Sequence, residues 1–282
     1  MIFQQDTITL NGDKIAYYTV GDPSNPPFLF VHGWSSYYGV WHNTIEALCD
    51  SYFCVALDLL GFGASDKPRQ GDYSIQAQGR RILALADTLN IERFYLAGHS
   101  MGGQIALCIA SMLAPERVIK LVDVAGVVAA SGAPEIERAY TLGRINYYAP
   151  IAMPLMRWIS ECEWLARRLY GLLFHDWSAV PFETWTGDRQ KIFQHGAHIG
   201  IYTASTAIHE LDLTDRLSSI IAPTLVIFGD DDHMVPIKDG LLANERISQS
   251  NLMIINACGH FPMYEHTTNY LEAIRQFLED EH

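Results

Sequence analysis

Basic residues are scarce in this chain of 282 residues, which has 19 lysines and arginines against 32 aspartates and glutamates. The formal net charge is −13, and no run of lysine or arginine interrupts the acidic balance. Such a chain would repel a phosphate backbone and an anionic membrane surface. We therefore expect neither nucleic acid nor a membrane among its partners, and we expect a small molecule instead.

Cysteine and long apolar runs are also in short supply. No stretch approaches the roughly 18 uninterrupted apolar residues of a membrane span, and Met1 to Gly12 lacks the regions of a signal peptide. The cysteines are odd in number and scattered, without CxxC spacing, so neither a disulfide framework nor a zinc site is expected. These absences indicate a cytoplasmic protein, and they leave a monomer or a homodimer open. The five cysteines are Cys49, Cys54, Cys108, Cys162 and Cys258.

What the chain does contain is a regular alternation of short apolar runs with longer segments of helical period. This pattern predicts an α/β protein with a mostly parallel sheet and helices on both faces. Asn11-Gly12 between the first two runs predicts a hairpin, and helices are expected from about Trp41, Ser74, Ser100 and Thr267. The predicted strands are Thr7–Leu10, Ile15–Val20, Phe28–Val31, Phe53–Leu57, Phe94–Ala97, Ile119–Val124, Thr224–Phe228 and Leu252–Ile255.

About 100 residues separate the sixth and seventh predicted strands, far more than one crossover helix needs. The intervening sequence is rich in tryptophan and tyrosine within helical patterns, and prolines interrupt it. We predict a core domain made of residues 1–126 and 217–282, with a helical cap inserted at residues 127–216.

The sharpest chemical signal is a GxSxG motif centred on Ser100, directly after one predicted strand and directly before a predicted helix running to Leu113. A serine in this tight turn is forced outward and sits at a helix N-terminus, where developing negative charge is stabilised. A chance occurrence in a loop is the alternative. The strand before and the helix after it favour Ser100 as a nucleophile.

A serine needs a base, and the base needs a carboxylate that orients it. His260 lies in a loop between the last strand and the last helix, and this loop can aim an imidazole across the sheet. His99 flanks the serine, so we expect its side chain to point away and to pack or bond locally. The loop after the seventh strand offers three aspartates, of which we choose Asp232, with Asp230 as the alternative.

Charge on a substrate oxygen must meet donors that are already aimed at it. The elbow itself places the Met101 N–H, and the turn His32-Gly33-Trp34 after the third strand offers the Trp34 N–H. A plain structural turn is the alternative reading of that segment. In both readings His32 belongs to the scaffold and carries no proton in the reaction.

Together these motifs resemble the α/β-hydrolase superfamily, in its branch of cap-bearing esterases, lipases and carbon–carbon hydrolases. The segment from Asp58 to Pro68 shares in the resemblance, although Leu60 stands where proline is commoner, and we regard this loop as structural. The resemblance implies an eight-stranded sheet and no cofactor. It also implies a triad of Ser100, Asp232 and His260. No HExxH motif or clustered spacing of histidines and carboxylates occurs in the sequence, so no metal is expected.

The predicted activity is that of a carboxylesterase-like serine hydrolase acting on small to medium apolar esters through an acyl-enzyme. Another triad reaction (carbon–carbon, thioester or lactone hydrolysis, or perhydrolysis) is the alternative, and a non-catalytic ligand receptor is a remote one. Aromatic side chains would line the pocket, unless they only form the core of the cap. The predicted substrate-binding residues are Trp34, Trp158, Trp164, Trp177, Trp185 and Phe261.

Overall fold

The computed structural model describes residues 2–129, 152–180 and 182–280, in which eight strands form one sheet. The strand order is β1-β2-β4-β3-β5-β6-β7-β8; β2 is antiparallel to both of its neighbours, and every other pair is parallel. All eight predicted strands are confirmed, with ends shifted by a few residues. The strands are β1 Gln4–Leu10, β2 Asp13–Val20, β3 Pro27–Val31, β4 Phe53–Leu57, β5 Phe94–His99, β6 Val118–Val124, β7 Thr224–Gly229 and β8 Ser250–Ile255.

The predicted hairpin joins β1 to β2. Asn11 and Gly12 both have positive φ, of 53° and 92°, and Leu10 pairs with Asp13 across the turn. A two-residue turn of this kind matches the twist of antiparallel strands, and asparagine and glycine adopt it at low cost. The prediction is confirmed.

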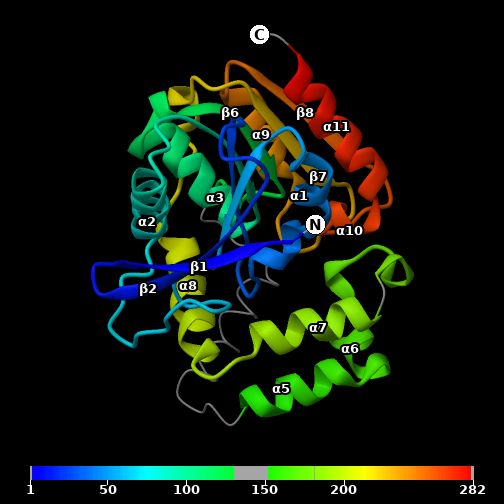
Figure 1. Cartoon of the computed structure of the whole chain (residues 1–282). Helices are drawn as coiled ribbons and strands as arrows, with labels where there is room; N and C mark the ends of the chain where they lie inside the picture. Colours follow the sequence, from blue (N-terminus) through cyan, green and yellow to red (C-terminus); the bar gives the residue numbers. More distant parts are fainter. Residues whose placement is uncertain (1, 130–151, 181, 281–282) are drawn as a thin grey trace.

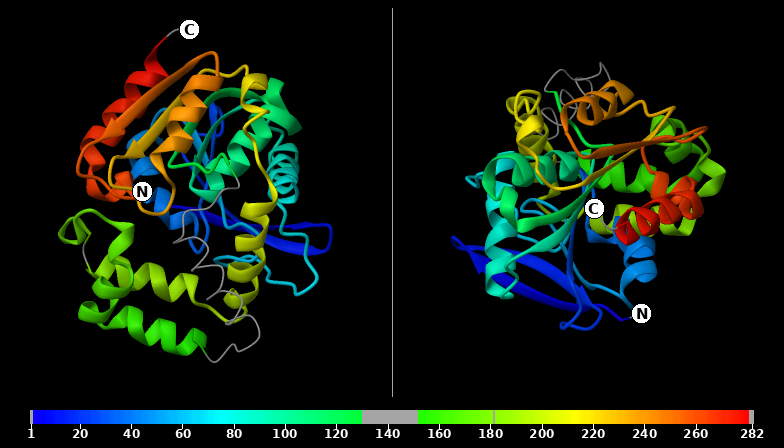
Figure 2. Two further views of the ribbon diagram at one scale, coloured as in Figure 1. Left: turned by 180° about the vertical axis from the view of Figure 1, so that it is seen from behind. Right: turned by 90° about the horizontal axis from the view of Figure 1, so that it is seen from above.

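Helices cover both faces of the sheet (Figures 1 and 2). One apolar layer holds buried side chains of α2, α3 and α9, and the other holds those of α1 and α11. Ser74 caps α2 as predicted, since its hydroxyl accepts from the Ala77 N–H at 3.2 Å. A π-helical turn continues α3 to Leu113. The helices are α1 His42–Leu48, α2 Ile75–Thr88, α3 Met101–Cys108, α9 Ile237–Arg246, α10 Pro262–Glu265 and α11 Thr267–Glu279.

A group of helices inserted between β6 and β7 forms the cap. In Figure 1, α5, α6 and α7 lie together beyond one end of the sheet. Helix α8 lies closer to the core, where Ile199 and Ile201 join the apolar layer of α2 and α3. The domain boundaries at residues 127 and 216 stay a prediction. The cap helices are α5 Ala152–Glu161, α6 Glu163–Leu169, α7 Phe182–Ile192 and α8 Ala197–Glu210.

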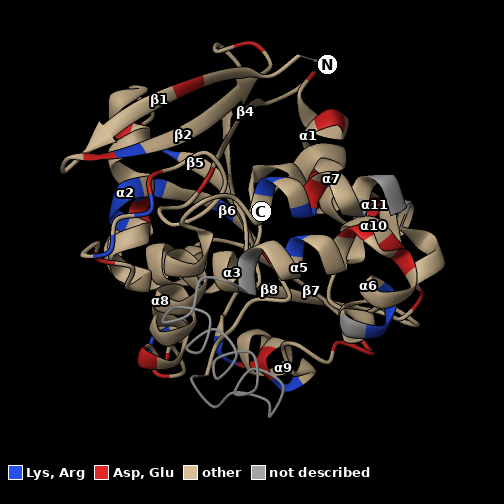
Figure 3. Cartoon of the chain, turned by 90° about the horizontal axis from the view of Figure 1, so that it is seen from below, with Lys and Arg blue, Asp and Glu red and all other residues tan. Residues whose placement is uncertain are grey.

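The surface carries charges of both signs. Figure 3, seen from the cap side, shows basic and acidic positions interspersed along α5, α6 and α7. Arg157 pairs with Glu161, and Arg167 pairs with Glu163, each one helical turn apart. None of the helices in the described ranges is long and apolar enough to cross a membrane. All five cysteines are free.

Candidate active site

Ser100 occupies a strained turn between β5 and α3. Its φ of 58° and ψ of −120° are rare for a residue with a side chain. The Ser100 N–H donates to the Val124 carbonyl at 2.9 Å, which ties the turn to β6. A Cβ at Gly98 would collide with the Gly102 carbonyl, and one at Gly102 would collide with the Val31 carbonyl. Only glycines fit these two positions, so the motif and the turn require each other.

His260 and Asp232 form a buried pair at the carboxyl ends of the parallel strands. His260 Nδ1 lies 2.7 Å from Asp232 Oδ2, and their side chains are 5% and 0% exposed. The other carboxylate oxygen of Asp232 accepts from the N–H groups of Met234 and Val235, at 2.8 and 3.0 Å. The carboxylate is therefore held by its own loop, and it orients the imidazole.

The neighbouring aspartates are directed elsewhere. Asp230 is exposed, and its carboxylate accepts weakly from the Cys258 N–H at 3.4 Å. Asp231 lies 2.8 Å from His175 and 3.1 Å from His233. Of the two aspartates considered from sequence, the structure brings Asp232 to His260.

His99 connects the serine turn to the histidine loop. Its Nε2–H donates to the His260 carbonyl at 2.9 Å, and the two rings lie 4.7 Å apart. Burial, together with the nearby His260, holds the pKa of His99 well below its usual range, so the ring is neutral. The expectation of local bonding was wrong, because His99, the last residue of β5, bonds to a residue 161 positions further along the chain. The residue before Ser100 is thereby in direct contact with His260.

The turn after β3 packs against the serine. A Cβ at Gly33 would lie 3.0 Å from the Ser100 Cβ, so the glycine allows close approach. His32 is fully buried, with Nδ1 2.8 Å from the Gly33 carbonyl and Nε2 accepting from the Leu59 N–H at 3.0 Å. These bonds assign the His32 proton to Nδ1, and burial lowers its pKa. His32 shapes the turn and is not available to accept a proton.

The two predicted oxyanion donors flank this contact. Met101 begins α3, and Trp34 follows the turn after β3. Within the described ranges neither amide donates to a backbone oxygen. The Trp34 indole has a different role, since its N–H donates to the Ile201 carbonyl of α8 at 2.7 Å. This side chain thus links the core to the cap.

The other aromatic residues predicted to bind substrate separate into two groups. Phe261 stacks on Phe174 at 5.2 Å, and Phe174 contacts Trp177 edge-on at 4.6 Å, which forms an aromatic cluster beside His260. Trp158 and Trp164 are 60% and 72% exposed. Their role in substrate binding stays a prediction. The side chain of Trp185 lies outside the described part of the structure.

The cap segment before α7 is bonded to the histidine loop. The His260 N–H donates to the Leu173 carbonyl at 2.9 Å. The Glu265 carboxylate accepts from the Gly259 N–H at 2.8 Å and from the His175 N–H at 2.7 Å. One glutamate therefore holds both the loop that carries the imidazole and the cap chain above it.

A polar cluster that sequence reasoning missed joins α7 to the core. The Asp188 carboxylate accepts from the hydroxyls of Tyr37 and Tyr264. Together with Phe261 and the buried Arg189, these residues line a small internal cavity. The sequence signal was an Asp-Arg pair within a predicted apolar cap, and its partners are too distant along the chain to be inferred.

Replacing Tyr37 with phenylalanine should lower the free energy of unfolding by about 1.5–3 kcal/mol, because the half-buried Asp188 carboxylate loses one donor. Tyr38→Phe is the matched control, since no hydrogen bond from the Tyr38 hydroxyl is found in the described residues. Urea unfolding of both variants measures the difference. Equal losses would show that the Tyr37 bond to the cap adds nothing to stability.

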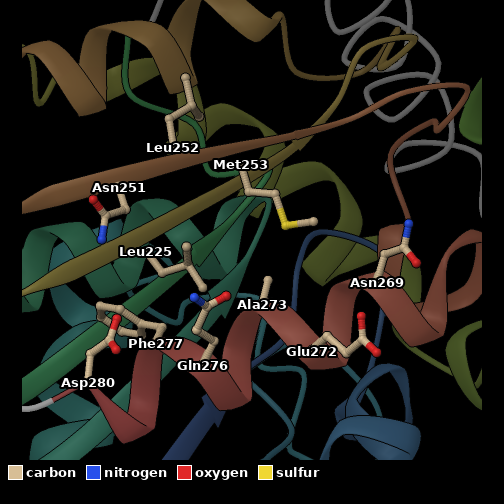
Figure 4. A pocket seen from close by; sticks show the side chains of 10 residues that line it. All are labelled: Leu225, Asn251, Leu252, Met253, Asn269, Glu272, Ala273, Gln276, Phe277 and Asp280. Carbon is tan, nitrogen blue, oxygen red and sulfur yellow. The ribbon is translucent and has the colours of Figure 1, made fainter.

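A groove of about 540 Å³ lies away from these residues, between β8 and α11 (Figure 4). It is open and shallow, and its lining includes Met253, Glu272 and Phe277. Neither the predicted triad nor the oxyanion turn contributes to it. Within the described ranges no group of three or more metal-ligating side chains is arranged to hold an ion.

Comparison with known proteins identifies the family. Residues 28–273 match the model of the alpha/beta hydrolase family, and the chain belongs to that family. The chain is 28% identical, over 256 residues, to a 2-hydroxy-6-oxononadienedioate/2-hydroxy-6-oxononatrienedioate hydrolase of Cupriavidus pinatubonensis. That alignment covers 87% of this chain and 82% of the relative.

Other relatives have different names. Lipase 3 of a Moraxella species is 28% identical over 281 residues, covering 95% of this chain and 83% of the lipase. The crystal structure of a meta-cleavage product hydrolase superposes with a TM-score of 0.81 at 26% identity, covering 98% of each chain. The chain is thus a member of a hydrolase family in which its relatives are named as a dienedioate hydrolase, a lipase and a meta-cleavage product hydrolase.

Proposed function

We propose that the protein is a serine hydrolase that cleaves carboxylic esters of small to medium apolar substrates. The observation that carries the proposal is the buried His260–Asp232 pair, in contact with the residue that precedes Ser100. Acyl transfer requires a serine hydroxyl within reach of an oriented imidazole, and His99 brings the turn that carries Ser100 into contact with His260.

In the proposed reaction, Ser100 Oγ attacks the ester carbonyl while His260 Nε2 accepts the serine proton. Asp232 fixes the proton of His260 on Nδ1 and stabilises the imidazolium. The N–H groups of Trp34 and Met101 stabilise the oxyanion. His260 then gives its proton to the leaving alcohol, and water attacks the acyl-enzyme by the same relay in reverse.

The preference for apolar substrates rests on the aromatic cluster of Phe174, Trp177 and Phe261, which lies beside His260. Apolar and aromatic side chains favour apolar acyl or alcohol groups. We expect kcat/KM for p-nitrophenyl esters to pass through a maximum as the acyl chain lengthens. A flat profile across chain length would contradict a shaped apolar pocket.

Carbon–carbon bond hydrolysis of a dienoic ketone is a second candidate. It is supported by the relative named as a dienedioate hydrolase and by Arg189, a cation in the cavity that Phe261 also lines. A carboxylate on such a substrate would need a positive charge within the site. We expect Arg189→Met to weaken cleavage of a carboxylated dienoic ketone more than cleavage of a neutral ester. If both reactions fall equally, this candidate loses its support.

A fluorophosphonate probe tests the enzyme class itself. We expect covalent labelling of Ser100, and a panel of esters, thioesters, lactones and dienoic ketones then ranks the reactions. If Ser100 does not react with the probe, the serine hydrolase proposal is wrong and a ligand receptor on the same fold takes its place.

A further inference from the structure

A buried carboxyl group lies behind the serine turn and has no role in the reaction proposed above. Asp123 is fully buried near the end of β6, and neither of its oxygens has a hydrogen-bond partner in the described residues. A Cβ at Gly103 or at Gly126 would overlap this carboxyl group. Two glycines therefore make room for it between the first turn of α3 and the chain that leaves β6.

Asp123 and its acidic neighbour Asp239 differ in their hydrogen bonds, and this difference decides which of the two carboxyl groups holds a proton. Burial raises the pKa of Asp239 on α9 as well, but its carboxylate accepts from the N–H groups of Val128 and Ala129, at 2.8 and 3.3 Å, and these two donors favour its charged form. Asp123 has no donor and faces the negative charge of Asp239. Burial and that charge raise the pKa of Asp123 to about 8, so the group is neutral at pH 7.

The other elements packed around Asp123 bring no compensating charge. On the neighbouring strands its paired residues are Gly98 and Val226. The first turn of α3 is Met-Gly-Gly. His99 is the nearest titratable residue on β5, but successive residues of a strand point to opposite faces, and the partner of His99 in the ladder is Val124. Asp239 is therefore the charged group that Asp123 faces.

We propose that Asp123 is a positioning residue that must stay protonated for Ser100 to react, so that its ionisation switches the site off at alkaline pH. The inference rests on the proposed function. The carboxyl lies against the first turn of α3, and the Met101 N–H of that turn is one of the two proposed oxyanion donors. A negative charge there would oppose the charge that develops on the substrate oxygen, and it would have no partner to compensate its own burial.

The test compares pH profiles of kcat for a p-nitrophenyl ester, after subtraction of spontaneous hydrolysis. We expect wild-type kcat to fall about tenfold for each pH unit above the pKa of Asp123. Asp123→Asn mimics the protonated acid, so its kcat should match the wild type at pH 7 and stay level above pH 8. Asp239→Asn removes the neighbouring charge and should move the alkaline fall to lower pH. Superimposable profiles for all three proteins would overturn the proposal.

Two further readouts keep the test independent of the substrate. Infrared spectra at pH 7 should contain a protonated carboxyl band that Asp123→Asn lacks, and its absence from the wild type would contradict the assignment. Because the folded chain retains the proton that an unfolded aspartate releases near its ordinary pKa of 3.8, wild-type stability should decrease as pH rises towards 8. If Asp123→Asn does not fold, the infrared band of the wild type and the shift of the alkaline fall in kcat of Asp239→Asn test the proposal. Failure of Ser100 to react would reject the proposed function, but the infrared band and the pH dependence of stability could still be measured.

Discussion

Ser100→Ala is expected to lower the turnover of an ester by about a millionfold, or roughly 8 kcal/mol in activation free energy. The substitution removes the attacking oxygen of the proposed mechanism. Alanine keeps the same Cβ at φ 58°, so the strain of the turn is unchanged and the fold should persist. Initial rates under saturating substrate, together with circular dichroism, measure both effects.

The matched control for this substitution is Ser111→Ala. Ser111 is also buried, but its hydroxyl donates to the Leu107 carbonyl within the helical segment after the elbow. We expect Ser111→Ala to retain wild-type turnover. Near-native ester hydrolysis by Ser100→Ala would remove the nucleophile from the proposed mechanism.

The elbow could be predicted from sequence because its physical requirements are local. The motif is bounded by a strand and a helix that apolar periodicity indicates, and both of its glycines are needed for contacts within a few residues or with the adjacent strand β3. The same holds for the hairpin at Asn11-Gly12 and for the cap of α2 at Ser74. Features encoded by neighbouring residues were therefore the ones predicted best.

The interior of the cap could not be predicted in the same way. Trp158 and Trp177 are both tryptophans in helical surroundings, yet one is exposed and the other packs on Phe174. Their different positions depend on how the cap meets the core. Contacts such as Glu265 with the His175 N–H join residues 90 apart, and no periodicity encodes them.

Asp123 illustrates a signal that was present but not used. It is a carboxylate near the end of an otherwise buried, mostly apolar strand, where an unpaired charge costs several kcal/mol. A residue that breaks the local pattern in this way often marks a functional site. The sequence could not show that the Asp123 carboxyl lacks a hydrogen-bond partner, because this depends on the glycines that surround it in the fold.

Asp232→Asn is expected to lower kcat by roughly 10⁴-fold while the loop keeps its shape. The amide oxygen can still accept from the N–H groups of Met234 and Val235, but the amide nitrogen would then face His260 Nδ1. Because that nitrogen donates, the imidazole must carry its proton on Nε2. In this tautomer His260 cannot accept the proton of Ser100, so the loss falls on kcat and not on KM.

Asp230→Asn is the control that separates this mechanism from a general loss of negative charge in the loop. Both variants remove one charge from neighbouring aspartates, but Asp230 is exposed and bonds to the Cys258 N–H. We expect Asp230→Asn to retain wild-type kcat and KM for the same ester. Equal losses in the two variants would mean that the imidazole responds to the summed charge of the loop, and the role of orienting His260 could then no longer be assigned to Asp232.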